Sequence, residues 1–506
     1  MTRQSSTSLK MAAQHQTDFP VEEYKDEDDA IDSITGQEED DVLLLTAEPV
    51  VHQGKCCILP EAPTFLYFLA VTTQYPVVQF WLFDHFSDQY SFNKANTTTE
   101  FCSSNASQTN SSEIEVLVQS RTNNYVMYTS FVCNFTAIIP ALLLGTLTDK
   151  LGRKFVFYIS FFGLMVSQLL TLMIFLYNLS PDLLYIASFI QGLSGSYGLF
   201  LAAIFGIAAD ITAVGKKRGF RVAAIEASLA VSTSIGTLTS GIWVKEMGYV
   251  WPMAAALGEI FIATLYVFFF IPETIIERRQ QPFSWRTLAK SVEFYFKDTP
   301  LKRRFRLIIC LLCFLAVLAA FMGESNFGML YLLHQPFCWP KEQITFFNGG
   351  LIFFKWVFVL VFLVIGKRCI SEPVFALIGS LSLASGYLLK GLATSDLLIF
   401  VGAGTSVLGE LVSPMCRTMM SRLVSHKEQG ALFAGIGVLQ MIVSAVSGII
   451  MSNIYNVGLT FFLGLPYLVL TGLISINVFL LSALIIRVKL NPNLGQPQTI
   501  EEQLIN

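Results

Sequence analysis

The chain has 506 residues, of which 53% are hydrophobic, 13% aromatic and only 14% charged. A soluble globular protein carries about 25% charged residues, so this composition excludes a soluble enzyme or binding domain and indicates a polytopic membrane protein. The formal net charge of −4 at pH 7 gives no indication of a nucleic-acid partner.

The first 60 residues are polar and acidic, and they contain the run "EEYKDEDDAIDSITGQEEDD". We expect a disordered cytosolic tail over residues 1–60, without a cleavable signal peptide. Glu39 stands four positions before Leu43 and Leu44. This spacing matches an acidic dileucine sorting signal, which a sorting adaptor would bind. The alternative is an acidic run that merely adjoins three leucines.

Twelve segments are long and apolar enough to span a membrane, since a spanning helix needs about 20 mostly apolar residues. In the uncharged run that forms the last two, the "SNIYNVG" patch at 452–458 predicts the turn. We therefore predict an all-α polytopic membrane protein with two six-helix bundles. The two bundles would occupy residues 61–273 and 306–488, with a basic cytosolic loop over 274–305 and a cytosolic tail over 489–506. The expected spans lie near 62–83, 124–147, 155–177, 183–209, 222–244, 251–272, 306–332, 344–366, 373–393, 397–424, 430–453 and 460–486.

The loops predict the orientation of the spans. Lys and Arg gather in alternate loops, with nine of them between 274 and 306, and such loops face the cytosol. Both termini are therefore expected in the cytosol. The large loop at 84–123 would face the other side, and it carries three glycosylation sequons, at Asn96, Asn105 and Asn110. Cys102 and Cys338 would face the same oxidising side, where a disulfide can form.

The stretch "GTLTDKLGRK" at 145–154 places a charge cluster between two apolar runs. Together with the layout of six spans, a basic loop and six more spans, it resembles the 2–3 loop signature of the major facilitator superfamily, Asp-x-x-Gly-Arg-Lys/Arg. Gly152 permits a sharp turn, Asp149 suits a helix N-terminus, and Arg153 can pair with Asp210 at the end of the fourth span. We expect these four residues to form an inner gate; the alternative is a positive-inside anchor alone.

Four further motifs resemble solute carrier family 46, the proton-coupled folate transporter family. They are "RVAAIEAS" (221–228), "PFCW" (336–339), "SPMCRTMMSRLV" (413–424) and "EQGALFAGIGVLQ" (428–440). The resemblance covers roughly residues 60 to 490. It implies that Cys102 and Cys338 form the outer disulfide of that family. It also shows a departure, because Phe321 stands where the folate transporter has a histidine that tunes proton binding.

The same resemblance assigns roles to two charges within spans. Glu226 matches a carboxylate used in proton coupling. Burial disfavours the charged form of a carboxyl group, which allows it to load and release a proton; a structural ion pair is the alternative. Arg417 matches an arginine used for substrate and proton function, and a guanidinium can clamp a carboxylate or phosphate in bidentate fashion. The alternative for Arg417 is snorkelling at the cytosolic end of its span.

Other buried charges are functional candidates because charge is costly within a membrane. Glu410 lies seven residues before Arg417 and is a candidate counter-ion for it. Lys355 is a candidate substrate-binding cation, paired with Glu324 or part of a structural salt bridge. Glu259 receives no role. The small-residue runs "GLSGSYG" (192–198) and "GAGTSVLG" (402–409) favour close helix packing.

These features predict a secondary transporter, not an enzyme, that couples proton movement to symport of an organic anion such as a folate or another conjugated carboxylate. No metal-ligand cluster or nucleotide-binding loop is visible, so protons are the expected coupling ion and no cofactor is expected. Two alternatives stay open: a proton-independent uniporter or exchanger, and a non-transporting receptor or scaffold on the same fold. The plasma membrane and endosomal or lysosomal membranes are all possible locations.

Overall fold

The structure is a computed structural model that describes residues 59–90, 109–212, 216–273, 301–366, 370–424 and 429–490. The chain divides into two units, Met1–Val51 and His52–Asn506. The first unit, with Glu39, Leu43 and Leu44, lies outside the described residues, as do most of the basic 6–7 loop and the C-terminal tail. All the elements named below belong to the second unit, and all of them are helical.

Within the described ranges of the first half, seven helices surround one hydrophobic core formed by residues between Tyr67 and Ile271. The fourth expected span is divided into two helices at Ser194 and Gly195. The helices are α2 (Glu61–Gln89), α4 (Thr109–Leu151), α5 (Arg153–Tyr177), α6 (Leu183–Leu193), α7 (Ser196–Ile211), α8 (Lys216–Met247) and α9 (Val250–Phe270).

The second half repeats this plan around a core of its own, which the first half enters through Phe80. Its tenth expected span is also divided, with a short 3-10 helix between two α-helices. The elements are α11 (Leu301–Leu333), α12 (Lys341–Gly366), α13 (Glu372–Gly391), α14 (Asp396–Thr405), η1 (Val407–Leu411), α15 (Val412–Arg422), α16 (Gln429–Phe461) and α17 (Leu465–Leu490).

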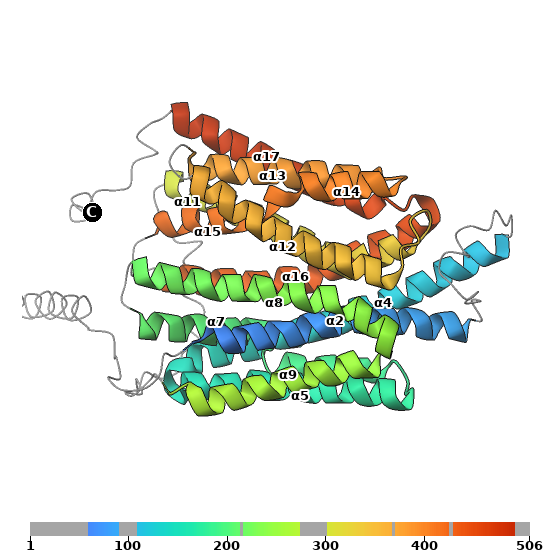
Figure 1. Cartoon of the computed structure of the whole chain (residues 1–506). Helices are drawn as coiled ribbons and strands as arrows, with labels where there is room; N and C mark the ends of the chain where they lie inside the picture. The colour runs from blue at the N-terminus through green and yellow to red at the C-terminus, as the bar shows by residue number, and fades with distance from the viewer. Residues whose placement is uncertain are drawn as a thin grey trace, which may run out of the picture. The chain divides into compact units, whose positions relative to one another are not determined.

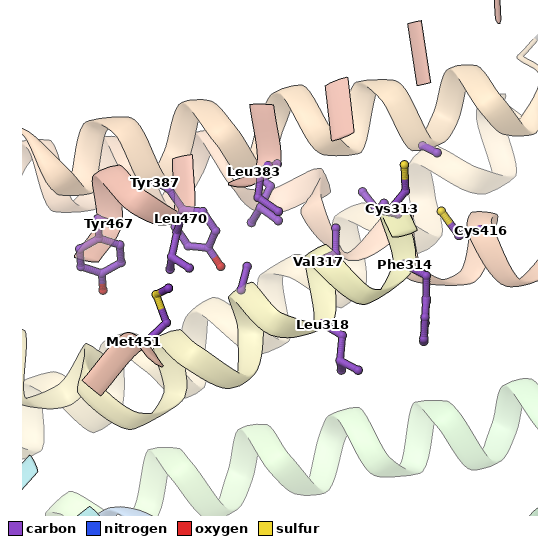
Figure 2. Packing of buried hydrophobic residues seen from close by; sticks show 14 of the residues in the cluster. Cys313, Phe314, Val317, Leu318, Leu383, Tyr387, Cys416, Met451, Tyr467 and Leu470 are labelled. Atoms are coloured by element: carbon purple, nitrogen blue, oxygen red, sulfur yellow. The ribbon is translucent and has the colours of Figure 1, made fainter. Parts of the chain in front are cut away.

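The helices lie roughly side by side, with those of the first half grouped together and those of the second half beside them (Figure 1). Figure 2 shows the second core, where side chains from α11, α13 and α17 converge. The surface of the bundles carries large apolar side chains such as Phe269 and Phe479, whose exposed fractions are 70% and 73%. This is the expected arrangement where the surrounding solvent is lipid.

Ten of the helical segments in the described ranges are long and apolar enough to cross a membrane by length and composition. The expected spans in α2 and α4 fall short of this measure. Ahead of its expected span, α4 carries buried polar side chains that bond the second half. Gln119 accepts a hydrogen bond from the Tyr455 hydroxyl (3.0 Å), and Asn123 donates one to the Ser452 carbonyl (2.8 Å).

One expected turn is wrong. The "SNIYNVG" patch does not end a helix, because α16 continues through it to Phe461 and the turn follows at 462–464. The polar residues of the patch have another purpose. Asn456 donates a hydrogen bond to Asn124 of α4 (2.7 Å), and Asn123 of α4 donates to Asn456 and to the Ser452 carbonyl (both 2.8 Å).

Below, the outer end of the bundles is the end at which α2 finishes, and the inner end is the end at which α2 begins. These names follow the orientation predicted by the basic loops.

Candidate functional site

The Gly152–Arg153–Lys154 signature forms the N-terminus of α5 at the inner end. Gly152 has φ +98°, a conformation that favours glycine. The first two amides of α5 donate to the Glu273 carboxylate, Arg153 N to Oε1 (2.8 Å) and Lys154 N to Oε2 (3.2 Å). A carboxylate at a helix N-terminus is stabilised by the helix dipole and by these amides. A Cβ at position 152 would collide with the same carboxylate.

Arg153 lies against the fourth span. A Cβ at Gly206 of α7 would approach an Arg153 guanidinium nitrogen to 2.5 Å, and Gly206 and Asp210 are four residues apart on one face of that helix. The backbone of Asp149 and Asp210 is helical, but their side chains lie outside what the structure describes. The structure therefore brings Arg153 to the expected part of α7, and the pairing with Asp210 stays a prediction.

Glu226 and Arg417 come from different halves of the molecule and lie within electrostatic range of each other. Glu226 lies on α8 and Arg417 on α15. The Arg417 guanidinium also lies over the Phe314 ring, 5.0 Å from its centroid, and donates a long hydrogen bond (3.4 Å) to Gln440 of α16. An arginine held this weakly by neutral partners can exchange them for an anion.

The break in the tenth span places Glu410 within η1. The Nζ of Lys355, from α12, lies 3.5 Å from Glu410 Oε1 and 5.6 Å from the centroid of the Phe321 ring. The expected pairing of Glu410 with Arg417 is therefore replaced by a pairing with Lys355. Lys355 also remains close enough to Glu324 for their charges to interact.

A second ion pair lies nearby in the same bundle. The Nζ of Lys390, at the end of α13, lies 2.7 Å from Glu324 Oε1, and the Tyr387 hydroxyl donates to Glu324 Oε2 (3.1 Å). The Lys390 side chain is only 8% exposed. Sequence analysis missed this lysine because it was placed at the end of a span. Its signal was the spacing of Tyr387 and Lys390, which places both on one face of α13.

The outer end is closed by polar contacts between the two halves. Lys341, the first residue of α12, bonds Asp84 of α2 (2.5 Å) and Tyr249 beside α9 (2.9 Å), and Tyr249 also bonds Asp84. We call these three residues the outer clasp. Beside it Lys245 of α8 pairs with Glu342 of α12 (2.7 Å), and across the bundle Glu115 of α4 pairs with His334 (2.6 Å). None of these contacts was expected from the sequence.

The remaining candidate residues are placed only in part. Cys338 is disulfide-bonded, but Cys102 lies outside the described residues, so the pairing of these two stays a prediction. Asn96 and Asn105 also lie outside them, and Asn110 falls in the first turn of α4. Glu259 of α9 has a buried Oε2 atom without a hydrogen-bond partner in the described part of the chain. Within those same ranges, His, Cys, Asp and Glu form no group able to hold a metal.

Both small-residue runs pack closely, as expected: a Cβ at Gly192 would approach the Cys133 carbonyl to 2.6 Å, and one at Gly402 would approach the Gly386 carbonyl to 3.0 Å. Both runs also contain a helix break. Gly195 (φ +79°) and Ser196 (φ +49°) separate α6 from α7 in "GLSGSYG", and Ser406 begins the 3-10 segment after "GAGT". The fourth and tenth spans hold the same position in the two halves. Paired interruptions of this kind mark substrate sites in transporters built from repeats.

Comparisons with known proteins agree with this geometry. The family model of the Major Facilitator Superfamily matches residues 64–323. The chain is 27% identical to the lysosomal proton-coupled steroid conjugate and bile acid symporter SLC46A3 of Gallus gallus, over 82% of this chain and 91% of that one. It is 26% identical to the proton-coupled folate transporter of Rattus norvegicus, over 86% and 92%. Among solved structures, the nucleoside transporter NupG aligns with a TM-score of 0.58 at 12% identity, over 84% of this chain and 98% of that one.

Proposed function

This chain belongs to the Major Facilitator Superfamily and is a multi-pass membrane transporter, and from that premise we propose that it couples proton movement to the symport of a small organic anion. One observation carries the proposal: Glu226 of the first half and Arg417 of the second half are close enough for their charges to interact. A carboxyl group and a guanidinium that neutralise each other can be separated by two ligands, a proton for the first and an anion for the second.

The coupling follows from the cost of unpaired charge in a membrane. When an anion binds to the Arg417 guanidinium, Glu226 loses its counter-charge, and protonation of Glu226 then restores neutrality. When the anion leaves, Arg417 again favours the ionised carboxylate, and the proton is released. Anion and proton therefore bind and leave together, which is the property that defines symport.

The closed outer end supports an alternating-access cycle. The outer clasp and its neighbours hold the two halves together at that end, so opening there requires these contacts to break. The signature around Gly152 and Arg153 would hold the inner end closed in the state in which the outer end is open. The relatives named above are proton-coupled symporters of folates or of steroid conjugates and bile acids, which favours an amphipathic anion as the substrate.

The test is uptake by cells that express the full chain with Leu43→Ala and Leu44→Ala, with the amount at the surface measured by biotinylation. Labelled folic acid, taurocholate and estrone sulfate serve as probes at outside pH 5.5 and 7.4. We expect uptake of at least one probe to be several-fold higher in acid. Glu226→Gln should abolish that difference, because the side chain no longer titrates.

Glu259→Gln is the matched control. It neutralises a carboxyl group that also lies within a span but is not part of the Glu226–Arg417 pair. A pH-independent uptake that Glu226→Gln leaves unchanged would favour a uniporter or exchanger. A third possibility is a receptor or scaffold that acts through its acidic tail. Uptake that survives deletion of residues 1–55 would contradict that possibility.

A further inference from the structure

Four charged side chains from four successive spans of the C-terminal bundle form one electrostatically linked group. They are Glu324 of α11, Lys355 of α12, Lys390 of α13 and Glu410 of η1. Two acids and two lysines balance in charge, as buried groups must. The proton and anion steps derived above use none of them. Their purpose therefore needs a separate explanation.

The two lysines are held very differently. Lys390 lies 2.7 Å from Glu324, whose other oxygen accepts the Tyr387 hydroxyl, so this carboxylate is bonded on both oxygens. Lys355 lies 3.5 Å from Glu410 and rests over the Phe321 ring. Both lysines lie over aromatic rings, Lys390 over Tyr387 and Tyr467, so the difference lies in the ion pairs. A short pair supported on both carboxylate oxygens resists separation more than a long pair does.

Among the described residues, few groups other than Lys355 could balance the charge of Glu410, because Lys390 of α13 is already paired with Glu324. Lys355 faces it from α12, and Tyr387 of α13 lies within electrostatic range. From α15, Arg417 is turned to Phe314 and Gln440. The charged residue of α14, Asp396, is at the opposite end of that helix and accepts a hydrogen bond from Trp339. Loss of Lys355 would leave the partly buried Glu410 carboxylate without its ion-pair partner, which favours its protonated form.

The helix break gives Glu410 its position. Ser406 to Leu411 form the interruption of the tenth span, and Arg417 follows Glu410 by seven residues, about two helical turns. Interrupted helices in corresponding spans point to the substrate site. Lys355, held at Glu410, is thus a second cation close to the segment that presents Arg417.

We propose that Glu410 is a second proton-carrying carboxylate, released by Lys355 when an anionic group of the substrate takes that lysine. The proton comes from the solution on the side of substrate entry and binds to a Glu410 oxygen as the substrate anion pairs with the Lys355 ammonium. On release of the substrate, Lys355 returns to Glu410 and the same proton leaves. This inference rests on the proposed function and adds one proton to each transport cycle.

The first experiment needs no substrate. The full-length protein in detergent is melted at pH 5.5 and pH 7.5, as wild type, as Lys355→Met and as the double variant Lys355→Met with Glu410→Gln. In Lys355→Met the folded state must bind a proton at Glu410 that the unfolded state does not hold at neutral pH. Its melting temperature should therefore rise on acidification relative to wild type, by an amount on the order of 2 °C.

The double variant should lose this extra pH dependence, since glutamine does not titrate. A Lys355→Met protein whose melting temperature depends on pH as wild type does would overturn the proposal. So would a double variant that keeps the extra dependence. Lys355→Arg, which preserves the charge, should behave as wild type.

The second experiment measures accumulation of the probe that the wild type transports, driven by a pH gradient. Removal of one proton from the cycle lowers the attainable accumulation ratio about tenfold for each pH unit of the gradient. We expect this reduction in Glu410→Gln, with exchange of probe at equal pH on both sides retained, and no reduction in Glu259→Gln. An unchanged ratio in Glu410→Gln would contradict the second proton.

The two proposals fail in distinguishable ways. A wild type that accumulates none of the probes under a pH gradient rejects the proposed function, and the melting experiment still decides whether Glu410 takes up a proton. A wild type with pH-driven accumulation that Glu410→Gln leaves intact keeps the proposed function and rejects this inference.

Discussion

The two ion pairs of the C-terminal bundle are alike in chemistry and different in geometry. Glu324 and Lys390 lie 2.7 Å apart, and Glu324 also accepts a hydrogen bond from the Tyr387 hydroxyl, while Glu410 and Lys355 lie 3.5 Å apart beside a break in the tenth span. The exposed fractions of the side chains follow the same order, 8% and 20% for Lys390 and Glu324 against 11% and 26% for Lys355 and Glu410. A tight buried pair holds the bundle in one arrangement, and a loose pair beside a helix break is free to change partners.

This difference separates a structural role from a transport role within one charge cluster. A pair that must break in every cycle cannot also be the pair that fixes the fold, because breaking a buried pair leaves a costly unpaired charge. The tight pair lies between α11 and α13, whose side chains also meet in the apolar core (Figure 2). The loose pair lies between α12 and the interrupted tenth span. Three further variants sharpen the contrast.

The largest effect is expected for Lys390→Met. The change leaves Glu324 buried without its closest cation, which costs about 3–5 kcal/mol where a buried pair is broken. We expect little folded protein in size-exclusion chromatography of the detergent extract. Adding Glu324→Gln should restore much of the folded fraction, because no charge is then left unpaired. A single variant that folds as well as wild type would show that the tight pair does not stabilise the bundle.

A smaller effect on the fold is expected when the loose pair is reversed, with Lys355→Glu and Glu410→Lys combined. The two opposite charges remain near each other, so the melting temperature should stay within a few degrees of wild type, which corresponds to about 1 kcal/mol. Proton-driven uptake should be lost, since the cation and the carboxylate have exchanged places relative to the substrate. Uptake at the wild-type level would contradict a transport role for this pair.

The smallest effect is expected for Tyr387→Phe. It removes one hydrogen bond to Glu324 Oε2 and leaves the ring in the core, at a cost of about 1 kcal/mol. Thermal unfolding of the purified variant measures this cost. Uptake at both pH values should be unchanged. A change in its pH dependence would show that the tight pair takes part in coupling.

The sequence predicted the features that depend on local pattern. The length of the apolar runs predicted the helices, apart from the turn expected at 452–458 and the breaks within the fourth and tenth spans. The motif "DKLGRK" located the sharp turn at Gly152. Each buried charge was also visible as a charge within a span, except for residues at span ends such as Lys390, Lys341 and Asp84. Charged residues at the ends of spans were assumed to be hydrated. The contacts that they make between the two halves at the outer end were therefore not predicted.

Only the tertiary structure decided how these groups are paired. Glu410 could not be matched to Lys355, nor the amides of Arg153 and Lys154 to Glu273, because the partners come from different helices. The length of an apolar run indicates that a helix crosses the membrane, since the thickness of the bilayer fixes the length of a spanning helix. The apolar run does not indicate which neighbouring helix each face will contact, because the neighbours are set by packing across the whole bundle. The sequence by itself therefore determined the helices and the cost of their buried charges, and the packing alone decided which charges neutralise each other.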